Sequence, residues 1–280
     1  MLIEVLDEAL LHSVRAALAE DVGNGDITAA LIPADSQARA TLICRESAIL
    51  CGMAWFNAVF AELDTAVNID WAVKDGDALS AGQTLCTLTG PARAILTGER
   101  TALNFLQTLS GTASLAQRYA ECVADLPVKI LDTRKTIPGL RAAQKYAVRI
   151  GGCYNHRAGL YDAVLIKENH LAAAGSIAQA VLHAADDNPG KLIEVEVENE
   201  AQIRAALETA ATRLLLDNFT TQALRAAVTL VGGRVELEAS GSFNLDNLRT
   251  AALTGVHYIS VGGLTKNIQA TDLSMRFADL

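Results

Sequence analysis

The sequence predicts an α/β protein in two parts, a small α/β or α+β unit followed by a compact or incomplete barrel of parallel strands. From about residue 128 onward, short apolar runs end in a polar or glycine residue, and Ala-rich helical segments follow them. Polar residues near the ends of the last four runs are 21, 21 and 22 residues apart, namely Glu196, Asp217, Glu238 and Ser260. This spacing fits one strand plus one helix and favours a barrel, with a doubly wound open sheet as the alternative.

The first part of the chain lacks this regularity. Apolar positions at helical spacing predict a helix over 5–20, which Gly23 and Gly25 end. Short strand-like runs separated by turn signals occupy 38–90. Residues 96–123 predict a long helix with small residues at 110–114. We interpret this helix as the connection between the two parts.

Six apolar runs predict six parallel strands joined by right-handed crossovers. The runs are VKILDT (128–133), YDAVLIKE (161–168), KLIEVEVE (191–198), TRLLLDN (212–218), RVELEAS (234–240) and HYISVGG (257–263). In such barrels the active site lies at the carboxyl ends of the strands. The residues at these ends are Arg134, Lys167, Glu196, Asp217, Ser240 and Gly262.

Composition excludes several classes of function. Hydrophobic residues make up 51% of the 280 residues and charged residues 20%, as in a folded globular protein. The net charge of −9 argues against a broad nucleic-acid surface. No stretch without Asp, Glu, Lys or Arg exceeds 17 residues, so no membrane span is predicted. The five scattered cysteines are typical of reduced thiols in a cytoplasmic protein.

One segment is basic against this acidic background. Between residues 129 and 167 there are eight Lys and Arg but only two Asp, a net charge of +6. Arg134, Lys135 and Lys167 follow predicted strand ends, where a polyanionic ligand would neutralise them. We interpret the other regularly spaced cations as a solvated helix face; they are Arg141, Lys145 and Arg149.

Carboxylates gather on the third of the six runs. Glu194, Glu196 and Glu198 alternate with apolar residues, so they share one face of a strand. With Asp217 one strand further on, Mg²⁺ or a pair of ribose hydroxyls is a sensible partner. A solvated edge strand is the alternative.

The last two strand-to-helix loops consist of small residues, ASGS (239–242) and SVGG (260–263). Small residues let backbone N–H groups approach an anion, so two such loops in succession predict a phosphate site. Ordinary tight turns are the alternative interpretation.

Several specific motifs occur in order along the chain. They are EDVGNGDIT (20–28), GERTALNFLQTLSG (98–111), DTRKTIPGLR (132–141), GGCYNHRAGLYDAVLIKENH (151–170), EVEVEN (194–199), LLLDN (214–218), LEASGS (237–242) and ISVGGLT (259–265). Over essentially its whole length the chain closely resembles the quinolinate phosphoribosyltransferase family, and DTRKTIPG followed by NHR and KENH is highly specific for it.

The resemblance implies a fold and an activity. The fold is an N-terminal α/β sandwich over residues 1–112, closed by the tail 266–280, plus an incomplete α/β barrel of about seven strands over 113–265. The implied enzyme is a transferase of the pentosyltransferase class, within the glycosyltransferases. It converts quinolinate and phosphoribosyl pyrophosphate (PRPP) into nicotinate mononucleotide, pyrophosphate and CO₂ in de novo NAD biosynthesis. Mg²⁺ accompanies PRPP, and no organic cofactor is implied.

The resemblance also assigns residues. The implied catalytic set is Lys135, Lys167, Glu196 and Asp217, the last two holding Mg²⁺ directly or through PRPP or water. The implied substrate-binding set is Arg100, Thr133, Arg134, Lys135, His156, Arg157, Lys167, His170, Glu196, Asp217, Ser240, Gly241, Ser242, Val261, Gly262 and Gly263. Ser242 departs from the glycine expected in its turn, and Cys153, where a third glycine is common, has no assigned role.

The resemblance implies partners as well. Arg100 resembles the arginine that reaches the site of the neighbouring subunit, so a homodimer, open to higher assembly, is implied. Neither nucleic acid nor a membrane is an expected partner, and the expected location is cytoplasmic. Three alternatives remain: a barrel aldolase using Lys167, a pyrophosphorylase-like protein of molybdate operons, and a non-catalytic ligand-binding relative. The intact NHR and KENH runs argue against the second.

Overall fold

The computed structural model describes residues 2–278, and side chains from residue 7 onward. The chain forms two compact units. The first comprises 1–117, 137–152 and 267–280, and the second comprises 118–136 and 153–266. The boundary predicted near residue 112 stays a prediction, and residues 1, 279 and 280 of the predicted sandwich and tail lie outside the described part.

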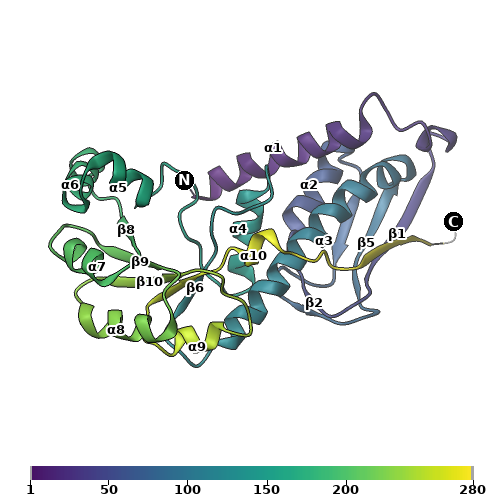
Figure 1. Cartoon of the computed structure of the whole chain (residues 1–280). Helices are drawn as coiled ribbons and strands as arrows, with labels where there is room; N and C mark the ends of the chain where they lie inside the picture. Colours follow the sequence, from purple (N-terminus) through teal and green to yellow (C-terminus); the bar gives the residue numbers. More distant parts are fainter. Residues whose placement is uncertain (1, 279–280) are drawn as a thin grey trace. The chain divides into compact units, whose positions relative to one another are not determined.

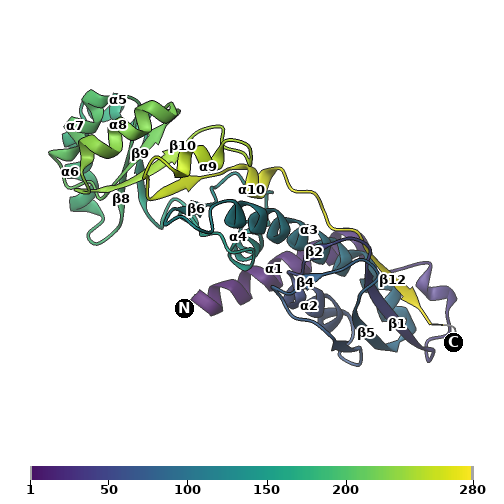
Figure 2. The same ribbon diagram turned by 90° about the horizontal axis from the view of Figure 1, so that it is seen from below.

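The first unit contains a four-stranded antiparallel sheet in the order β12-β1-β5-β3. Its strands are β1 (Gln37–Cys44), β3 (Asn68–Trp71), β5 (Thr84–Pro91) and β12 (Leu273–Phe277). A small pair joins β2 (Ala48–Ile49) to β4 (Ala78–Leu79). Figure 2 shows β12, near the C-terminus, beside β1, where Ala40 is paired with Phe277. Every second residue of β1 is buried, so this sheet turns one face to a core.

Helices complete the first unit. They are α1 (Leu2–Val22), the 3₁₀ turn η1 (Ala29–Leu31), α2 (Met53–Leu63), α3 (Ala92–Cys122) and α4 (Arg141–Ile150). The helices predicted over 5–20 and 96–123 are confirmed as α1 and α3, and the last residues of α3 belong to the second unit. Gly111 lies in the small-residue patch of α3, where a Cβ would collide with the carbonyl of Gln269.

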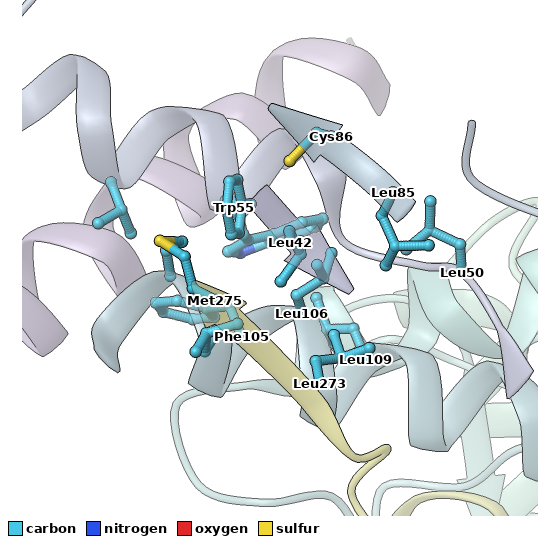
Figure 3. Packing of buried hydrophobic residues seen from close by; sticks show 14 of the residues in the cluster. Leu42, Leu50, Trp55, Leu85, Cys86, Phe105, Leu106, Leu109, Leu273 and Met275 are labelled. Atoms are coloured by element: carbon cyan, nitrogen blue, oxygen red, sulfur yellow. The ribbon is translucent and has the colours of Figure 1, made fainter. Parts of the chain in front are cut away.

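The core of the first unit is apolar. Figure 3 shows Leu42 of β1, Trp55 of α2, Leu106 of α3 and Leu273 of β12 packed together, and each is at most 5% exposed. Burial of each large apolar side chain contributes about 1.5–3 kcal/mol, so this cluster is the main source of stability in the unit.

The solvated face predicted for α4 is wrong at one position. Arg149 is exposed and Arg141 half-buried, but Lys145 is only 5% exposed. The regular spacing of the three cations does not show that Lys145 lies on the buried side of the helix, together with Gln144, Ala147 and Val148. Its aliphatic stem therefore contributes to packing.

The second unit contains six parallel strands in the order β6-β11-β10-β9-β8-β7. They are β6 (Lys129–Leu131), β7 (Val164–Ile166), β8 (Ile193–Val197), β9 (Arg213–Asp217), β10 (Glu236–Ser240) and β11 (Tyr258–Ser260), each within or overlapping its predicted run. From β7 to β11 successive strands are neighbours, and β11 pairs with β6. In a doubly wound sheet the order of the strands reverses in the middle of the sheet. The order observed here has no such reversal and confirms the barrel, which is open between β6 and β7. An isolated parallel bridge from Leu131 to Tyr154 lies where a seventh strand would begin.

Helices follow the strands. They are α5 (Glu168–Ala174), α6 (Ile177–Asp187), α7 (Glu200–Leu207), α8 (Thr221–Val231), α9 (Leu248–Ala252) and α10 (Gly263–Lys266). Figure 1 shows α6 to α9 following one another around the outside of the strands, and consecutive members are in contact. Covered on both faces, all five residues of β8 are buried, so the edge-strand alternative is wrong for Glu194 and Glu196, whereas Glu198 follows the strand and is exposed. Among the described helices, none has the length and apolar character that a bilayer crossing requires.

Candidate functional site

A cavity of about 350 Å³ lies at the carboxyl ends of the barrel strands, entirely within the second unit. Its lining combines cations, carboxylates and hydroxyls: Thr133, Arg134, Lys135, His156, Arg157, Leu165, Lys167, Glu196, Leu215, Glu238, Ser240 and Ser260. Eight of these residues are in the site predicted from the sequence. The cavity therefore has the position expected for a barrel active site and the charge expected for an anionic ligand.

The loop after β6 presents the first cations. The backbone N–H of Lys135 donates to Thr133 Oγ1 at 3.1 Å, and the Lys135 carbonyl accepts from Thr265 Oγ1 at 2.9 Å. At Gly262 a Cβ would lie 2.9 Å from Lys135 Cδ. The missing side chain leaves space for the lysine stem, which a larger residue at this position would displace.

Asp132, at the end of β6, organises the segment that carries His156. Its fully buried carboxylate accepts the backbone N–H of His156 at 2.8 Å and the side-chain amide of Asn155 at 2.7 Å. Hydrogen bonds to a charged acceptor are strong, at roughly 1.5–3 kcal/mol. Asp132 therefore fixes the loop from which His156 and Arg157 reach the cavity.

Both ring nitrogens of His156 are engaged within the protein. Nδ1 accepts the backbone N–H of Arg157 at 2.7 Å, and Nε2 lies 3.0 Å from Glu194 Oε2. Because Nδ1 is an acceptor, the ring proton is on Nε2 and points towards the carboxyl group. The assignment of His156 as a direct substrate ligand stays a prediction.

Arg157 is a partly desolvated cation. Burial lowers the pKa of its guanidinium, and the nearby Arg134 lowers it further. One N–H group donates to the carbonyl of Ala163 at 3.0 Å. Two neighbouring arginines at the cavity wall repel each other, so an anionic ligand between them would be favourable.

Lys167 and Glu196 form an ion pair across two neighbouring strands. Lys167 Nζ donates to Glu196 Oε2 at 2.6 Å, with the lysine side chain 45% exposed and the glutamate 7%. Burial raises the pKa of Glu196, and the Lys167 ammonium opposes that rise. His170 is exposed outside the cavity lining, where its Nδ1 accepts the backbone N–H of Lys167 at 2.9 Å.

Asp217 ends β9 beside a residue with an unusual backbone. Asn218 has a positive φ of 56°, its side-chain amide donates to Asp217 Oδ2 at 2.7 Å, and its backbone N–H donates to Ser240 O at 2.9 Å. Left-handed backbone at a residue other than glycine is uncommon, and asparagine tolerates it best. Asn218 therefore orients the predicted carboxylate, although it is not among the predicted site residues.

Each of the two predicted phosphate turns contributes one serine to the cavity lining, Ser240 from the first and Ser260 from the second. Ser240 lines the cavity, whereas the next two residues, Gly241 and Ser242, do not. In the second turn the backbone N–H of Val261 donates to Leu131 O at 2.9 Å, as part of the barrel ladder. Gly263 begins α10. A phosphate role of these turns stays a prediction.

Arg100, the predicted cross-subunit residue, does not line the cavity. It is an exposed residue of α3 in the first unit. Its predicted reach into a partner's site stays a prediction.

The barrel interior holds two carboxyl groups that the predicted site left out, the interior carboxyl pair Glu194 and Glu238. Both side chains are 0% exposed. With His156 they form a group whose potential ligand atoms all lie within 4.8 Å of one another. The available signal was the period-two run ELEAS, which turns Glu238 to the same interior face as Ser240.

Comparisons with known proteins agree along the chain. Residues 26–110 match the model for the N-terminal domain of quinolinate phosphoribosyl transferase, and 112–276 match the model for its C-terminal domain. The chain is 42% identical to a probable nicotinate-nucleotide pyrophosphorylase (carboxylating) of Bacillus subtilis, over 91% of this chain and 89% of that one. It is 40% identical to a quinolinate phosphoribosyltransferase (decarboxylating) of Nicotiana tabacum, over 94% and 81%. The solved nicotinate-nucleotide pyrophosphorylase from Francisella tularensis superposes with a TM-score of 0.93 at 45% identity, covering 97% and 96%.

Proposed function

Because the chain belongs to the quinolinate phosphoribosyltransferase family, we propose that it transfers the phosphoribosyl group of PRPP to quinolinate and releases CO₂. The products are nicotinate mononucleotide and pyrophosphate, so the enzyme is a pentosyltransferase of de novo NAD biosynthesis. The observation that carries the proposal is the cavity itself, which presents Arg134, Lys135, Arg157 and Lys167 to one space. Quinolinate brings two carboxylates and PRPP brings phosphates, so both substrates match this charge.

Substrate binding divides between the loops. Arg134 and Arg157 suit the two quinolinate carboxylates, since guanidinium groups bind carboxylates through paired hydrogen bonds. Lys135 and Lys167 suit the phosphates and leaving pyrophosphate as compact positive charges. Thr133, His156 and His170 complete the predicted set, and Ser240–Ser242 and Val261–Gly263 are the proposed phosphate turns.

The reaction needs no covalent nucleophile. Departure of pyrophosphate leaves positive charge on the ribose, which Glu196 and Asp217 stabilise, and the pyridine nitrogen of quinolinate captures the sugar carbon. The resulting pyridinium stabilises the electron pair that remains on C2 when CO₂ leaves. Positioning and electrostatic stabilisation are therefore the main catalytic demands, and the described lining residues are suited to both.

Mg²⁺ fits this donor set in a supporting role. Mg²⁺ prefers oxygen ligands in octahedral geometry and retains several waters. Glu196 and Asp217 are carboxylates on adjacent strands, and the charge of Asp217 raises the pKa of Glu196, as expected for neighbouring anions. Lys167 already pairs with Glu196, so Glu196 and Asp217 alone would not complete the coordination of the ion. PRPP oxygens and water would supply the remaining ligands. Bound there, the ion would neutralise phosphate charge.

The ion pair weakens the case for an aldolase. A Schiff-base lysine must be neutral to attack a carbonyl, and its pKa is lowered by desolvation or by a neighbouring cation. Lys167 instead has a side chain that is 45% exposed, and its Nζ donates to Glu196 Oε2 at 2.6 Å, so the nitrogen is engaged in an ion pair and not held in an apolar pocket. Lys167 therefore suits anion binding better than carbonyl chemistry.

The assembly and location complete the proposal. Exposed on α3, Arg100 is available to a second copy of the chain, and we place it in the partner's site within a homodimer. The division into a sandwich over 1–112 and a barrel over 113–265, with the tail 266–280 on the sandwich, is part of the same proposal, supported by the pairing of β12 with β1. All five cysteines are free, in keeping with a reducing cytoplasm.

The deciding experiment measures CO₂ release from carboxyl-labelled quinolinate, with and without PRPP and Mg²⁺. We expect CO₂ and pyrophosphate in equal amounts, and only when PRPP is present. Absence of CO₂ release under every condition would reject the proposal, and binding of quinolinate without turnover would favour the non-catalytic relative. Borohydride trapping of a carbonyl substrate on Lys167 would favour the aldolase.

A further inference from the structure

The interior carboxyl pair, Glu194 and Glu238, has no part in the proposed reaction so far. The two residues project from β8 and β10 into the barrel, where His156 Nε2 lies 3.0 Å from Glu194 and 3.5 Å from Glu238. Glu238 also lies 3.5 Å from the Arg213 guanidinium. Strands β8 and β10 are not adjacent, because β9 lies between them. The side chains of Glu194 and Glu238 therefore approach each other and His156 across the barrel interior.

Glu238 is the member that faces the cavity. It is in the cavity lining although its side chain is 0% exposed, so it forms part of the floor. Neither of its carboxyl oxygens has a hydrogen bond of ordinary geometry among the described residues. A buried carboxylate without hydrogen bonds is costly, and protonation is the least costly way to remove the charge.

The surroundings of Glu238 favour its acid form. Burial raises the pKa of Glu238 to about 8, and the neighbouring Glu194 adds to that rise. His156, the Ser260 hydroxyl and Arg213 oppose it. Below pH 8 the residue can therefore donate a proton into the cavity.

Other lining carboxyl groups are less suited to this role. Glu196 already accepts a hydrogen bond from the Lys167 ammonium at 2.6 Å, so its carboxyl group is engaged in an ion pair. A metal ion in place of the proton is disfavoured, because the Arg213 guanidinium beside Glu238 would repel it.

On the basis of the proposed function, we propose that Glu238 donates the proton that replaces the departing CO₂ at C2 of the pyridine ring. The C2–carboxylate bond breaks, CO₂ leaves, and the bonding electron pair remains on C2. The O–H bond of the Glu238 carboxyl group then breaks as the C2–H bond forms, which leaves Glu238 as a carboxylate. Solvent returns the proton when the product leaves, so each turnover takes up one proton. His156 and Glu194 are positioning residues for this acid.

The test separates phosphoribosyl transfer from product formation within a single turnover. In Glu238→Gln we expect pyrophosphate release to stay within about threefold of wild type, whereas nicotinate mononucleotide forms at least about 100-fold more slowly, the usual contribution of a general acid. Phosphoribosylated quinolinate should accumulate, because the C2 carbanion recaptures CO₂ when no acid is present. The control is Glu208→Gln, at an exposed carboxylate just after α7 and outside the cavity lining, which should form product at the wild-type rate.

A second measurement needs no variant. Wild-type enzyme with quinolinate in H₂O is mixed rapidly into D₂O containing PRPP, and the hydrogen at C2 of the first product is analysed. Because Glu238 is 0% exposed beneath the ligand, we expect more protium than the mixed solvent contains.

The inference has distinct ways to fail. Wild-type product formation in Glu238→Gln, an equal loss of both steps, or a first product with the isotope content of the solvent would each overturn it. Absence of quinolinate-dependent pyrophosphate release from the wild-type enzyme would instead reject the proposed function.

Discussion

The interiors of the two units are built on opposite principles. In the first unit, β1 alternates buried and more exposed residues, and its buried face meets an apolar cluster that includes Trp55 and Leu106. In the second unit, β8 is buried at all five positions, yet two of those residues are Glu194 and Glu196.

The difference assigns a separate role to each interior. Apolar burial stabilises a fold by an amount that grows with area, whereas a buried carboxyl group costs free energy unless it is paired or protonated. Retaining several such groups in one barrel is therefore unfavourable for stability and useful for chemistry. Substitutions in the first interior should affect unfolding, and substitutions in the second should affect turnover.

The largest expected effect tests the apolar interior. Leu106→Ala removes a side chain that is 0% exposed, on a helix that accepts alanine well, so the loss is one of packing. We expect the free energy of unfolding to fall by about 2–5 kcal/mol in urea titrations. The control Leu31→Ala, at a residue 83% exposed, should change it by less than about 0.5 kcal/mol. Equal effects of the two variants would contradict the packing described for this unit.

The next effect tests the charged cavity. Arg134→Ala and Lys167→Ala each remove a charge-assisted contact worth roughly 1.5–3 kcal/mol, so kcat/KM should fall at least about tenfold. Urea unfolding should change much less than in Leu106→Ala. Lys191→Ala removes the same charge from an exposed site outside the cavity and should leave the kinetics unchanged. Wild-type kcat/KM in both cavity variants would rule out their assignment to substrate binding.

The pH dependence of stability sharpens the contrast further. The folded protein keeps the Glu238 proton up to about pH 8, whereas the unfolded chain releases it near the ordinary value of 4.5. The folded state binds more protons over this window, so its stability falls as pH rises. Relative to Glu238→Gln, the wild type should lose up to about 1.4 kcal/mol per pH unit between pH 5 and 8. The free energy of unfolding of both proteins is measured by denaturant titration at each pH. If it depends on pH in the same way in the wild type and in Glu238→Gln, Glu238 is ionised in the folded state.

The smallest effect concerns Asn218. Asn218→Ala removes the hydrogen bond to Asp217 and places a Cβ residue at a φ of 56°, whereas Asn218→Gly removes the same bond but tolerates the backbone. We expect the alanine variant to be about 1 kcal/mol less stable than the glycine variant. Both should lose turnover by the same factor, up to about tenfold. Equal stability of the two variants, or different turnover between them, would contradict this account.

Much of the barrel could be predicted from the sequence because its strands are short, apolar and evenly spaced. The order of the six strands follows from that spacing, and the motifs placed Arg134, Lys167 and Glu196 in one cavity. The proposed acid role of Glu238 could not be predicted, because it depends on which carboxyl group is buried without a hydrogen bond of ordinary geometry after folding. The burial of Lys145 and the backbone of Asn218 are likewise properties of packing, which periodicity does not encode.

The opening between β6 and β7 has a consequence for how selectivity could change. The stretch 153–163 occupies the place of a missing strand, yet only Tyr154 of this stretch forms a bridge to a barrel strand. This stretch therefore forms part of the barrel wall and positions His156 and Arg157, but it contributes almost nothing to the pairing of the strands. Insertions or replacements beyond Arg157 would change the shape of the cavity wall, while the hydrogen bonds between the six strands and those from Asn155 and His156 to Asp132 stay intact. We therefore expect substitutions between residues 158 and 163 to change the preference among pyridine carboxylates most readily.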